Sequence, residues 1–190
     1  MLQELLKQAT STQHNDLEQL MFVNDIMHGT LTADQYKKLL LTNYLSHAIF
    51  EDDLLNNLSP ALRHELQADE RAKFQALEKD LEEMQVSVPK NNPDLKAIPT
   101  DDASILGAMY VLEGATLGGN VIVKRLKVNP QLEPLQLGYH YYQVYGDKLV
   151  DRWKQFVQIL NTRIPQAEHP KAAQAAKDMF ENIKLLSTAV

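Results

Sequence analysis

Apolar residues recur at helical spacing along most of the chain, and the longest apolar stretch runs from Ile105 to Leu126, ILGAMYVLEGATLGGNVIVKRL. No proline interrupts this stretch and it is apolar on most sides, so we expect one buried helix. Four glycines lie within it: Gly107, Gly114, Gly118 and Gly119. Since each glycine inside a helix costs about 1 kcal/mol relative to alanine, something is expected to approach this backbone closely.

Three of these glycines share one face of the expected helix. At 100° per residue, Gly107, Gly114 and Gly118 lie within about 40° of one another, so that face has no side chains over about three turns. A closely packed neighbouring helix is one explanation. A planar ligand lying against the backbone is the other.

The rest of the hydrophobic pattern also predicts helices. Leucines from Leu2 to Leu20 share one face of a first helix, which is expected to end in turn residues at 24–29. Thr32 is a typical N-cap for a second helix that reaches Leu54. Ser59-Pro60 indicates the start of a third, which continues to Met84.

Proline and asparagine predict a loop over residues 88–100, after which Asp101 or Asp102 caps the glycine-bearing helix. Asn129-Pro130 ends the C-terminal region of that helix. A fifth helix is expected from Leu149 to Pro165, and Pro170 opens a last one. No stretch alternates convincingly, so the sequence predicts an all-α bundle that forms one domain over residues 1–190.

Composition narrows the possible functions. With 190 residues, of which 44% are hydrophobic, the chain can bury a substantial core. No segment approaches about 18 apolar residues without a charge, and the N-terminus lacks the layout of a signal peptide, so we expect a soluble, cytoplasmic protein away from membranes. The absence of cysteine excludes disulfides, thiolate metal sites and a cysteine nucleophile. A net charge of −6 disfavours nucleic acid as the main partner.

Histidines are the remaining candidates for chemistry. Four of them lie at turns or among polar neighbours and are expected to be ordinary surface or structural residues: His28, His64, His140 and His169. His47 and Glu51 are four residues apart, which is a spacing that metal sites use. Carboxylate-bridged diiron bundles need a second such pair on a partner helix, and the sequence has none, so a non-haem metal site is disfavoured.

His14 lies at the flank of the first helix's apolar face, about 110° from its centre, and Lys7 points within about 20° of the same direction. On a single helix the two groups would be ~10 Å apart along the axis, which matches the distance from a haem iron to its propionate edge. A boundary histidine and a solvated lysine are the alternative.

The segments LLKQATSTQHNDLE around His14 and YVLEGATLGGNVI on the glycine helix resemble the two signature regions of the haem oxygenases. The resemblance is closest to the bacterial branch that includes bacteriophytochrome-associated enzymes. It continues through Tyr44 and Glu51, Gly146 and the Arg152-Trp153 segment, and then into the alanine-rich region that ends at Phe180, so it covers most of the chain.

The resemblance implies a fold of the haem oxygenase type and assigns roles to individual residues. His14 would be the proximal iron ligand, and Gly114, Gly118 and Gly119 would lie on the distal helix over the haem. Arg125, near the end of the same stretch, is also expected to contact the cofactor. Ala115 stands where animal-type enzymes have an aspartate, a departure that the bacterial branch commonly shares.

Haem oxygenation requires bound oxygen to attack the porphyrin's own meso carbon, and a strong distal acid would promote the wrong cleavage. Distal glycines leave room for oxygen and ordered water without supplying such an acid. Haem would therefore be cofactor and substrate, with O2 as co-substrate. Electrons would come from a ferredoxin or an NAD(P)H-dependent reductase, since the chain has no Gly-x-Gly-x-x-Gly fingerprint and no cysteines. A phytochrome is a possible acceptor of the product.

The position of ring opening depends on how the haem is rotated in its plane. Lys7 and Tyr110, four residues before Gly114, are expected to hold the propionates. In the family that this sequence resembles, lysine and tyrosine at these positions accompany opening at the α-meso carbon, which predicts biliverdin IXα. The alternative is that Lys7 is a solvated charge and Tyr110 a core residue.

Rival functions share parts of this pattern. A haem carrier or sensor without ring-opening activity would also use His14 and an apolar pocket, although it would need no distal glycine face. Thiamin-degrading helical enzymes have a similar fold but use a cysteine nucleophile, which this chain lacks. A purely structural interaction bundle is the remaining alternative.

Overall fold

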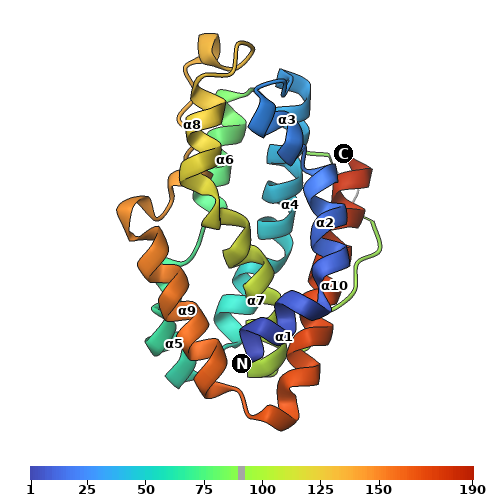
Figure 1. The fold of residues 1–190 in the computed structure, drawn as a ribbon, viewed down its shortest axis with the longest axis vertical. Helices are drawn as coiled ribbons and strands as arrows, with labels where there is room; N and C mark the ends of the chain where they lie inside the picture. Colours follow the sequence, from blue (N-terminus) through green and yellow to red (C-terminus); the bar gives the residue numbers. More distant parts are fainter. Residues whose placement is uncertain (90–92) are drawn as a thin grey trace.

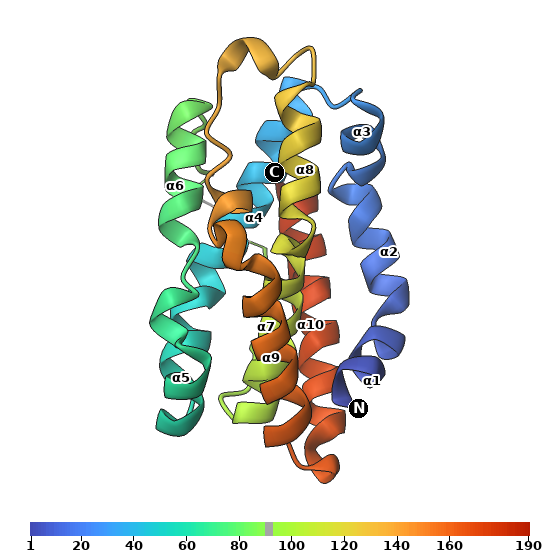
Figure 2. The same cartoon turned by 60° about the vertical axis from the view of Figure 1, so that its left-hand side comes forward.

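The computed structural model describes residues 1–89 and 93–190, and in this part of the chain the fold is all-α without strands, as predicted. The longer helices run roughly along one axis, and short 3-10 turns and loops join them (Figure 1, Figure 2). The α-helices are α1 Leu2–Ala9, α2 Ser11–Leu20, α3 Val23–His28, α4 Ala33–Asn57, α5 Pro60–Leu66, α6 Phe74–Glu83, α7 Asp102–Leu117, α8 Gly119–Lys127, α9 Leu149–Arg163 and α10 His169–Ala189. The 3-10 turns are η1 Ala68–Glu70, η2 Glu133–Leu135, η3 Tyr141–Gln143, η4 Gly146–Lys148 and η5 Gln166–Glu168.

The predicted helix starts are confirmed. The Thr32 side chain accepts a hydrogen bond from the backbone N–H of Gln35 at 3.1 Å, and the Gln35 side chain accepts one from the Thr32 backbone at 2.8 Å. This capping box satisfies two donors that α4 would otherwise leave free. Asp101 caps α7 through the backbone N–H of Ser104 at 3.2 Å, and Pro60 is the first residue of α5.

Three helices that were predicted as continuous are divided, and in this respect the predictions were wrong. The first is broken at Thr10, and the expected turn after it contains α3. The third is broken at Gln67, whose φ of +52° is left-handed and cannot continue a helix. The glycine helix is broken at Gly118, whose ψ of −2° departs from the helical value and redirects α8.

The central helix of the molecule is α7, with α4, α9 and α10 around it (Figure 1, Figure 2). Almost every side chain from Ala103 to Met109 is buried. Gly107 lies so close to α10 that a Cβ there would be 2.1 Å from the backbone oxygen of Ala172. The two helices are therefore almost in backbone contact, which fixes the N-terminal half of α7.

The buried apolar side chains form two clusters. The larger one joins α1, α4, α5, α7, α9 and α10, and the smaller one joins α3, the start of α4, α6, α8 and the tyrosines at 139–142. Tyr44 packs against both clusters. Most apolar positions of α4, α9 and α10 lie in or against these clusters. Leu149 at the start of α9 is buried outside both clusters, and Leu5 of the first predicted face is 37% exposed.

The segment before α7 is a loop in its described part, as predicted, although residues 90–92 of the predicted loop lie outside the described residues. Asn182 of α10 accepts a hydrogen bond from the Lys96 backbone N–H at 2.8 Å and donates one to the Lys96 carbonyl at 2.9 Å. Asp102–Lys127 is long and apolar enough to meet a length and composition criterion for a membrane span. The core helix of a soluble protein meets the same criterion, and 56% of the most apolar part of this segment is buried within the fold.

Candidate active site

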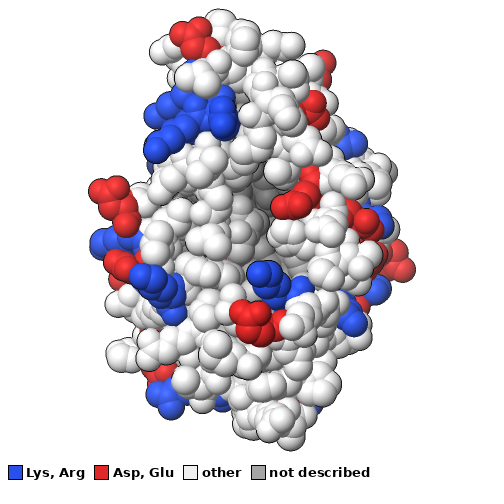
Figure 3. Space-filling view, in the orientation of Figure 1, with Lys and Arg blue, Asp and Glu red and all other residues white. Residues whose placement is uncertain are grey.

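One face of the molecule is hollowed between α2 on one side and α7 and α8 on the other (Figure 3). Large apolar side chains on α7 and α8 are open to solvent, with Leu117 of α7 40% exposed and Val121 of α8 53% exposed. Hollows and exposed apolar side chains are each typical of ligand sites.

The four glycines of α7 and α8 have different surroundings. A Cβ on Gly107 would meet the Ala172 backbone, and one on Gly119 would lie 2.3 Å from the backbone oxygen of Tyr142. By contrast, the nearest atom to a Cβ on Gly114 is 3.8 Å away, and on Gly118 it is 3.5 Å away. Of the two explanations for the shared glycine face, the closely packed neighbouring helix is correct at Gly107, because α10 covers this residue.

Gly114 is half-buried and Gly118 is exposed, so both leave backbone accessible near the break between α7 and α8. Gly119 is buried, and close packing against the η3 turn gives it a structural role of its own. Ala115, between the two accessible glycines, is exposed and offers no acid. The structure thus brings together two predicted distal positions that have room above the backbone.

His14 lies on α2 with its side chain 57% exposed. The imidazole packs against Phe180 of α10 in a T-shaped arrangement, with ring centroids 6.0 Å apart. Nδ1 is 3.7 Å from a carboxylate oxygen of Glu18. This separation is longer than a hydrogen bond, so Glu18 acts on the imidazole through its charge.

Lys7 is exposed in the last turn of α1. Because Thr10 separates α1 from α2, the shared direction of Lys7 and His14, which was worked out for one helix, no longer follows. Their common role in holding a ligand therefore stays a prediction that rests on the resemblance.

Tyr110 is half-buried on α7, with its ring 5.8 Å from that of Trp153 and tilted by 41°. Burial, with a smaller effect from Glu4, raises the pKa of the Tyr110 hydroxyl, so this group remains a hydrogen-bond donor. Arg125 is exposed in the last turn of α8 beside Lys124 and Lys127, and Figure 3 shows basic side chains gathered over this helix.

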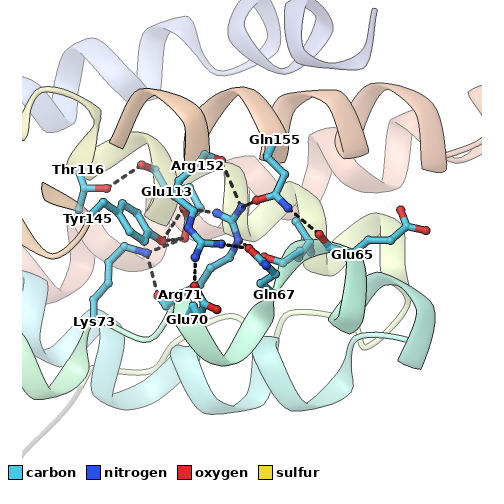
Figure 4. A network of polar contacts seen from close by, with 11 residues as sticks. Glu65, Gln67, Glu70, Arg71, Lys73, Glu113, Thr116, Tyr145, Arg152 and Gln155 are labelled. Carbon is cyan, nitrogen blue, oxygen red and sulfur yellow. Dashed lines mark hydrogen bonds and ion pairs between the residues drawn. The ribbon is translucent and has the colours of Figure 1, made fainter. Parts of the chain in front are cut away.

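Directly before Gly114, the carboxylate of Glu113 is buried among cations (Figure 4). One of its oxygens accepts from Arg71 at 2.7 Å, the other from Lys73 at 2.6 Å, and the Tyr145 hydroxyl contacts both, at 2.9 and 3.0 Å. Burial alone would raise the pKa of Glu113, but Lys73 and Arg71 together hold it below its ordinary value. Glu113 is therefore an anion whose charge is fully committed to partners within the protein.

Arg71 extends this network to α9, since it donates to the Arg152 carbonyl at 3.2 Å and to the Gln155 side chain at 3.3 Å (Figure 4). Sequence reasoning missed these residues. The available signal was Glu113, the one acid in the stretch from Ile105 to Leu126, because a buried carboxylate must be paired. Its partners, Arg71 and Lys73, are 42 and 40 residues away along the chain, and no pattern in the sequence identified them.

His47 and Glu51 form a buried pair on α4, with Nδ1 and Oε2 2.6 Å apart. Glu51 also accepts from the backbone N–H groups of Lys73 at 2.7 Å and Phe74 at 3.0 Å. Burial lowers the pKa of His47, so the imidazole is neutral. The carboxylate is used to hold the start of α6, which agrees with the argument against a diiron site.

A second group of possible metal ligands is Asp80, Glu83 and His140, whose ligand atoms lie within 4.8 Å of one another. Both Asp80 oxygens accept backbone hydrogen bonds, from His140 and Tyr141, at 2.7 and 2.9 Å. Glu83 accepts from Gly138 and pairs with the His140 ring. This arrangement fastens the segment before η3 to α6.

A family model described as "Heme oxygenase" matches residues 1–188. A curated relative named "Heme oxygenase", from Xanthomonas campestris pv. campestris, is 29% identical over 157 residues, which are 80% of this chain and 88% of that protein. The fold is similar to the structure of a haem oxygenase from Leptospira interrogans, with a TM-score of 0.79, 18% identity and coverage of 100% of this chain and 99% of the other. It is also similar to haem oxygenase-1 from the cyanobacterium Synechocystis in complex with haem, with a TM-score of 0.74, 20% identity and coverage of 98% and 91%.

Proposed function

Because the chain belongs to the haem oxygenase family, we propose that it opens the porphyrin ring of haem with O2 and external electrons and releases biliverdin, carbon monoxide and ferrous iron. The observation that carries this proposal is the family match, which spans residues 1–188 and so includes both the His14 segment and the glycine segment. Haem supplies the oxygen chemistry when it is bound, and the protein supplies orientation and a suitable environment.

The described residues fit such a ligand. His14 is an exposed imidazole with one nitrogen directed to Glu18, so we propose that Nε2 binds the haem iron. The carboxylate of Glu18 would strengthen His14 as a donor by attracting the Nδ1 proton. Phe180 limits the rotation of the ring.

On the opposite side, we assign Gly114 and Gly118 to the distal surface, because both leave room where a side chain would otherwise stand. Gly119 would support this surface by anchoring the start of α8 on Tyr142. Neither Ala115 nor the fully paired Glu113 offers a free acid that could direct oxygen toward a competing cleavage.

We further propose opening at the α-meso carbon, giving biliverdin IXα. Lys7 and Tyr110 would hold the propionates, with Arg125 as a further contact, and so fix the rotation of haem in its plane. A contact near solvent contributes only ~1 kcal/mol, yet this changes the ratio of two orientations about fivefold. The double substitution Lys7→Asn and Tyr110→Phe should broaden the product to other isomers, which chromatography of the biliverdins measures.

The electron donor would be a ferredoxin or an NAD(P)H-dependent reductase, and a phytochrome is a proposed acceptor of the product. The sequence supports an external donor, since it has no cysteine for an iron–sulfur cluster and no dinucleotide fingerprint.

The direct test is to add haemin to the purified protein, record the Soret band, and then supply a reductant and O2. Loss of the Soret band with growth of a biliverdin band supports the enzyme, whereas a stable oxygenated spectrum would support a carrier and overturn the proposal. His14→Ala should change the ferric spectrum, and added imidazole should restore it in part. Gly118→Leu should bind haem but give little biliverdin, and a natural yield from this variant would contradict the distal assignment.

A further inference from the structure

A small cavity of about 20 Å³ lies between α4 and α7, on the side of α7 that faces the protein interior. Its polar lining includes His47, Glu51, Lys73 and Glu113, all of which are buried. Since roughly 10–15 Å³ is enough for one water molecule, the cavity can hold a single water and nothing much larger.

His47 presents an unused acceptor to this region. Glu51 is held as an anion, because its hydrogen bonds to His47, Lys73 and Phe74 outweigh the effect of burial and keep its pKa low. Nδ1 of His47 must therefore carry the proton that it shares with Glu51 at 2.6 Å. Nε2 is left with a lone pair, and no described residue hydrogen-bonds to it although it is buried. A buried polar atom in this condition normally has a water partner.

Lys73 presents the complementary donor. Its ammonium has three protons, and hydrogen bonds among the described residues use two of them, to Glu113 at 2.6 Å and to the Arg71 carbonyl at 3.1 Å. The Tyr145 hydroxyl is a further partner of this ammonium, so Lys73 shares its protons among several acceptors, while His47 Nε2 is the acceptor in the cavity lining that the described residues leave without a hydrogen bond. The charges around the cavity already balance, since Lys73 and Arg71 face Glu113 and Glu51, so an ion would not be favoured there.

We propose that this cavity binds one water molecule, which accepts a hydrogen bond from Lys73 Nζ and donates one to His47 Nε2, and that His47 acts through this water as a positioning residue for the end of α7. The link is short, because Lys73 holds Glu113 and Glu113 directly precedes Gly114. The water thus connects α4 to the segment whose backbone forms the distal surface. Its effect on haem chemistry rests on the proposed function, whereas the water site itself does not.

A high-resolution crystal structure of the natural protein without haem tests the site directly. The expected result is one water oxygen within about 3.2 Å of both Lys73 Nζ and His47 Nε2. Nitrogen NMR of the same protein should show the proton of His47 on Nδ1. A proton on Nε2, or a site without an ordered water, would overturn the proposal.

Two variants separate positioning from general support of the fold. His47→Gln keeps an acceptor for the water in its carbonyl and a donor for Glu51 in its amide, while His47→Phe keeps the volume and loses both. Amide hydrogen exchange over residues 111–117 should be roughly tenfold faster in the phenylalanine variant and close to natural in the glutamine variant. Equal exchange in both variants would contradict the proposal.

With haem added, His47→Phe should give a broader mixture of biliverdin isomers at natural haem affinity, and His47→Gln should restore the natural product. If the natural protein converts haem to biliverdin but no ordered water occupies the cavity, this inference is wrong and the proposed function stands. If the water is present but the natural protein produces no biliverdin, the proposed function is wrong and the water site stands.

Discussion

Alanine substitutions at the four helix glycines should divide into two classes, although all four replace a glycine in one apolar stretch. Gly107 represents the first class. An alanine Cβ there would lie 2.1 Å from the Ala172 backbone oxygen, whereas carbon atoms in good contact are about 3.5–4.0 Å from their neighbours. A backbone carbonyl in α10 cannot rotate away, so α7 and α10 must separate.

The expected loss follows from two opposing effects. Overpacking typically costs about 1–3 kcal/mol, and a backbone obstacle places Gly107→Ala near the upper value. Alanine recovers about 1 kcal/mol of helix propensity, so the net destabilisation is about 2 kcal/mol. For a chain of this length that lowers Tm by roughly 4–8 °C. Gly119→Ala should behave in the same way, because its Cβ would lie 2.3 Å from the Tyr142 oxygen.

Gly114→Ala is the matched control in the same helix. The nearest atom to its Cβ belongs to Trp153 at 3.8 Å, which is an ordinary contact, so only the gain in helix propensity remains. We expect Tm to stay unchanged or to rise by up to about 4 °C. Thermal unfolding followed by circular dichroism measures Tm of both variants without haem. Equal stability of Gly107→Ala and Gly114→Ala would refute the reasoning.

Three further predictions follow from the site. Glu113→Gln leaves Arg71 and Lys73 buried without a counter-charge and should cost about 3–5 kcal/mol in urea unfolding. Removal of the partly exposed Glu65 carboxylate, which pairs with the exposed Arg163, should cost under about 1 kcal/mol, and similar losses from the two substitutions would contradict the assignment. Glu18→Gln should weaken His14 as a donor and raise the reduction potential of bound haem, which spectroelectrochemistry measures, and an unchanged potential would exclude that role. Burial keeps the pKa of His47 below its ordinary value of 6.5 in the fold, so the unfolded chain takes up a proton first as pH falls below 6.5. The free energy of unfolding should therefore decline by up to about 1.4 kcal/mol per pH unit in this range. His47→Gln should flatten this slope, and an unaltered slope would show that another group is responsible.

The fold class and the helix starts could be predicted from the sequence because their causes are local. Thr32 with Gln35, and Asp101, satisfy donors of the first turn with their own side chains. Pro60 suits the first position of α5 because it has no N–H to satisfy. The break at Gln67 has no local signal, since glutamine does not favour the left-handed backbone that it adopts here, and its side chain is held by Arg152, 85 residues away along the chain. Apolar periodicity continues across such a break and therefore predicts one helix where two form.

The candidate site was predictable only in part, for the same reason. The glycines could be found from the sequence, but what covers each one depends on helices elsewhere in the chain, so Gly107 was grouped with Gly114. His14 was identified by its position and by resemblance. Glu18 lies four residues further along the same helix, a spacing that the sequence already shows, whereas the contact with Phe180 became visible only in the fold. The buried ion pairs of Glu113 could not be predicted, because their partners Arg71 and Lys73 are distant along the chain.

The ion network around Glu113 also bears on how fast the protein folds and unfolds. Its members come from the segment before α6, from α7, from the turn before η4 and from α9, so the contacts of the Glu113 carboxylate all join residues that are far apart in the sequence. Charges that must lose water before their partners are in place are unfavourable early in folding, and we expect the network to form after the folding transition state. Glu113→Gln would then leave the folding rate nearly unchanged and accelerate unfolding. The network would slow unfolding and so lengthen the time for which the segment beside Gly114 keeps its native structure.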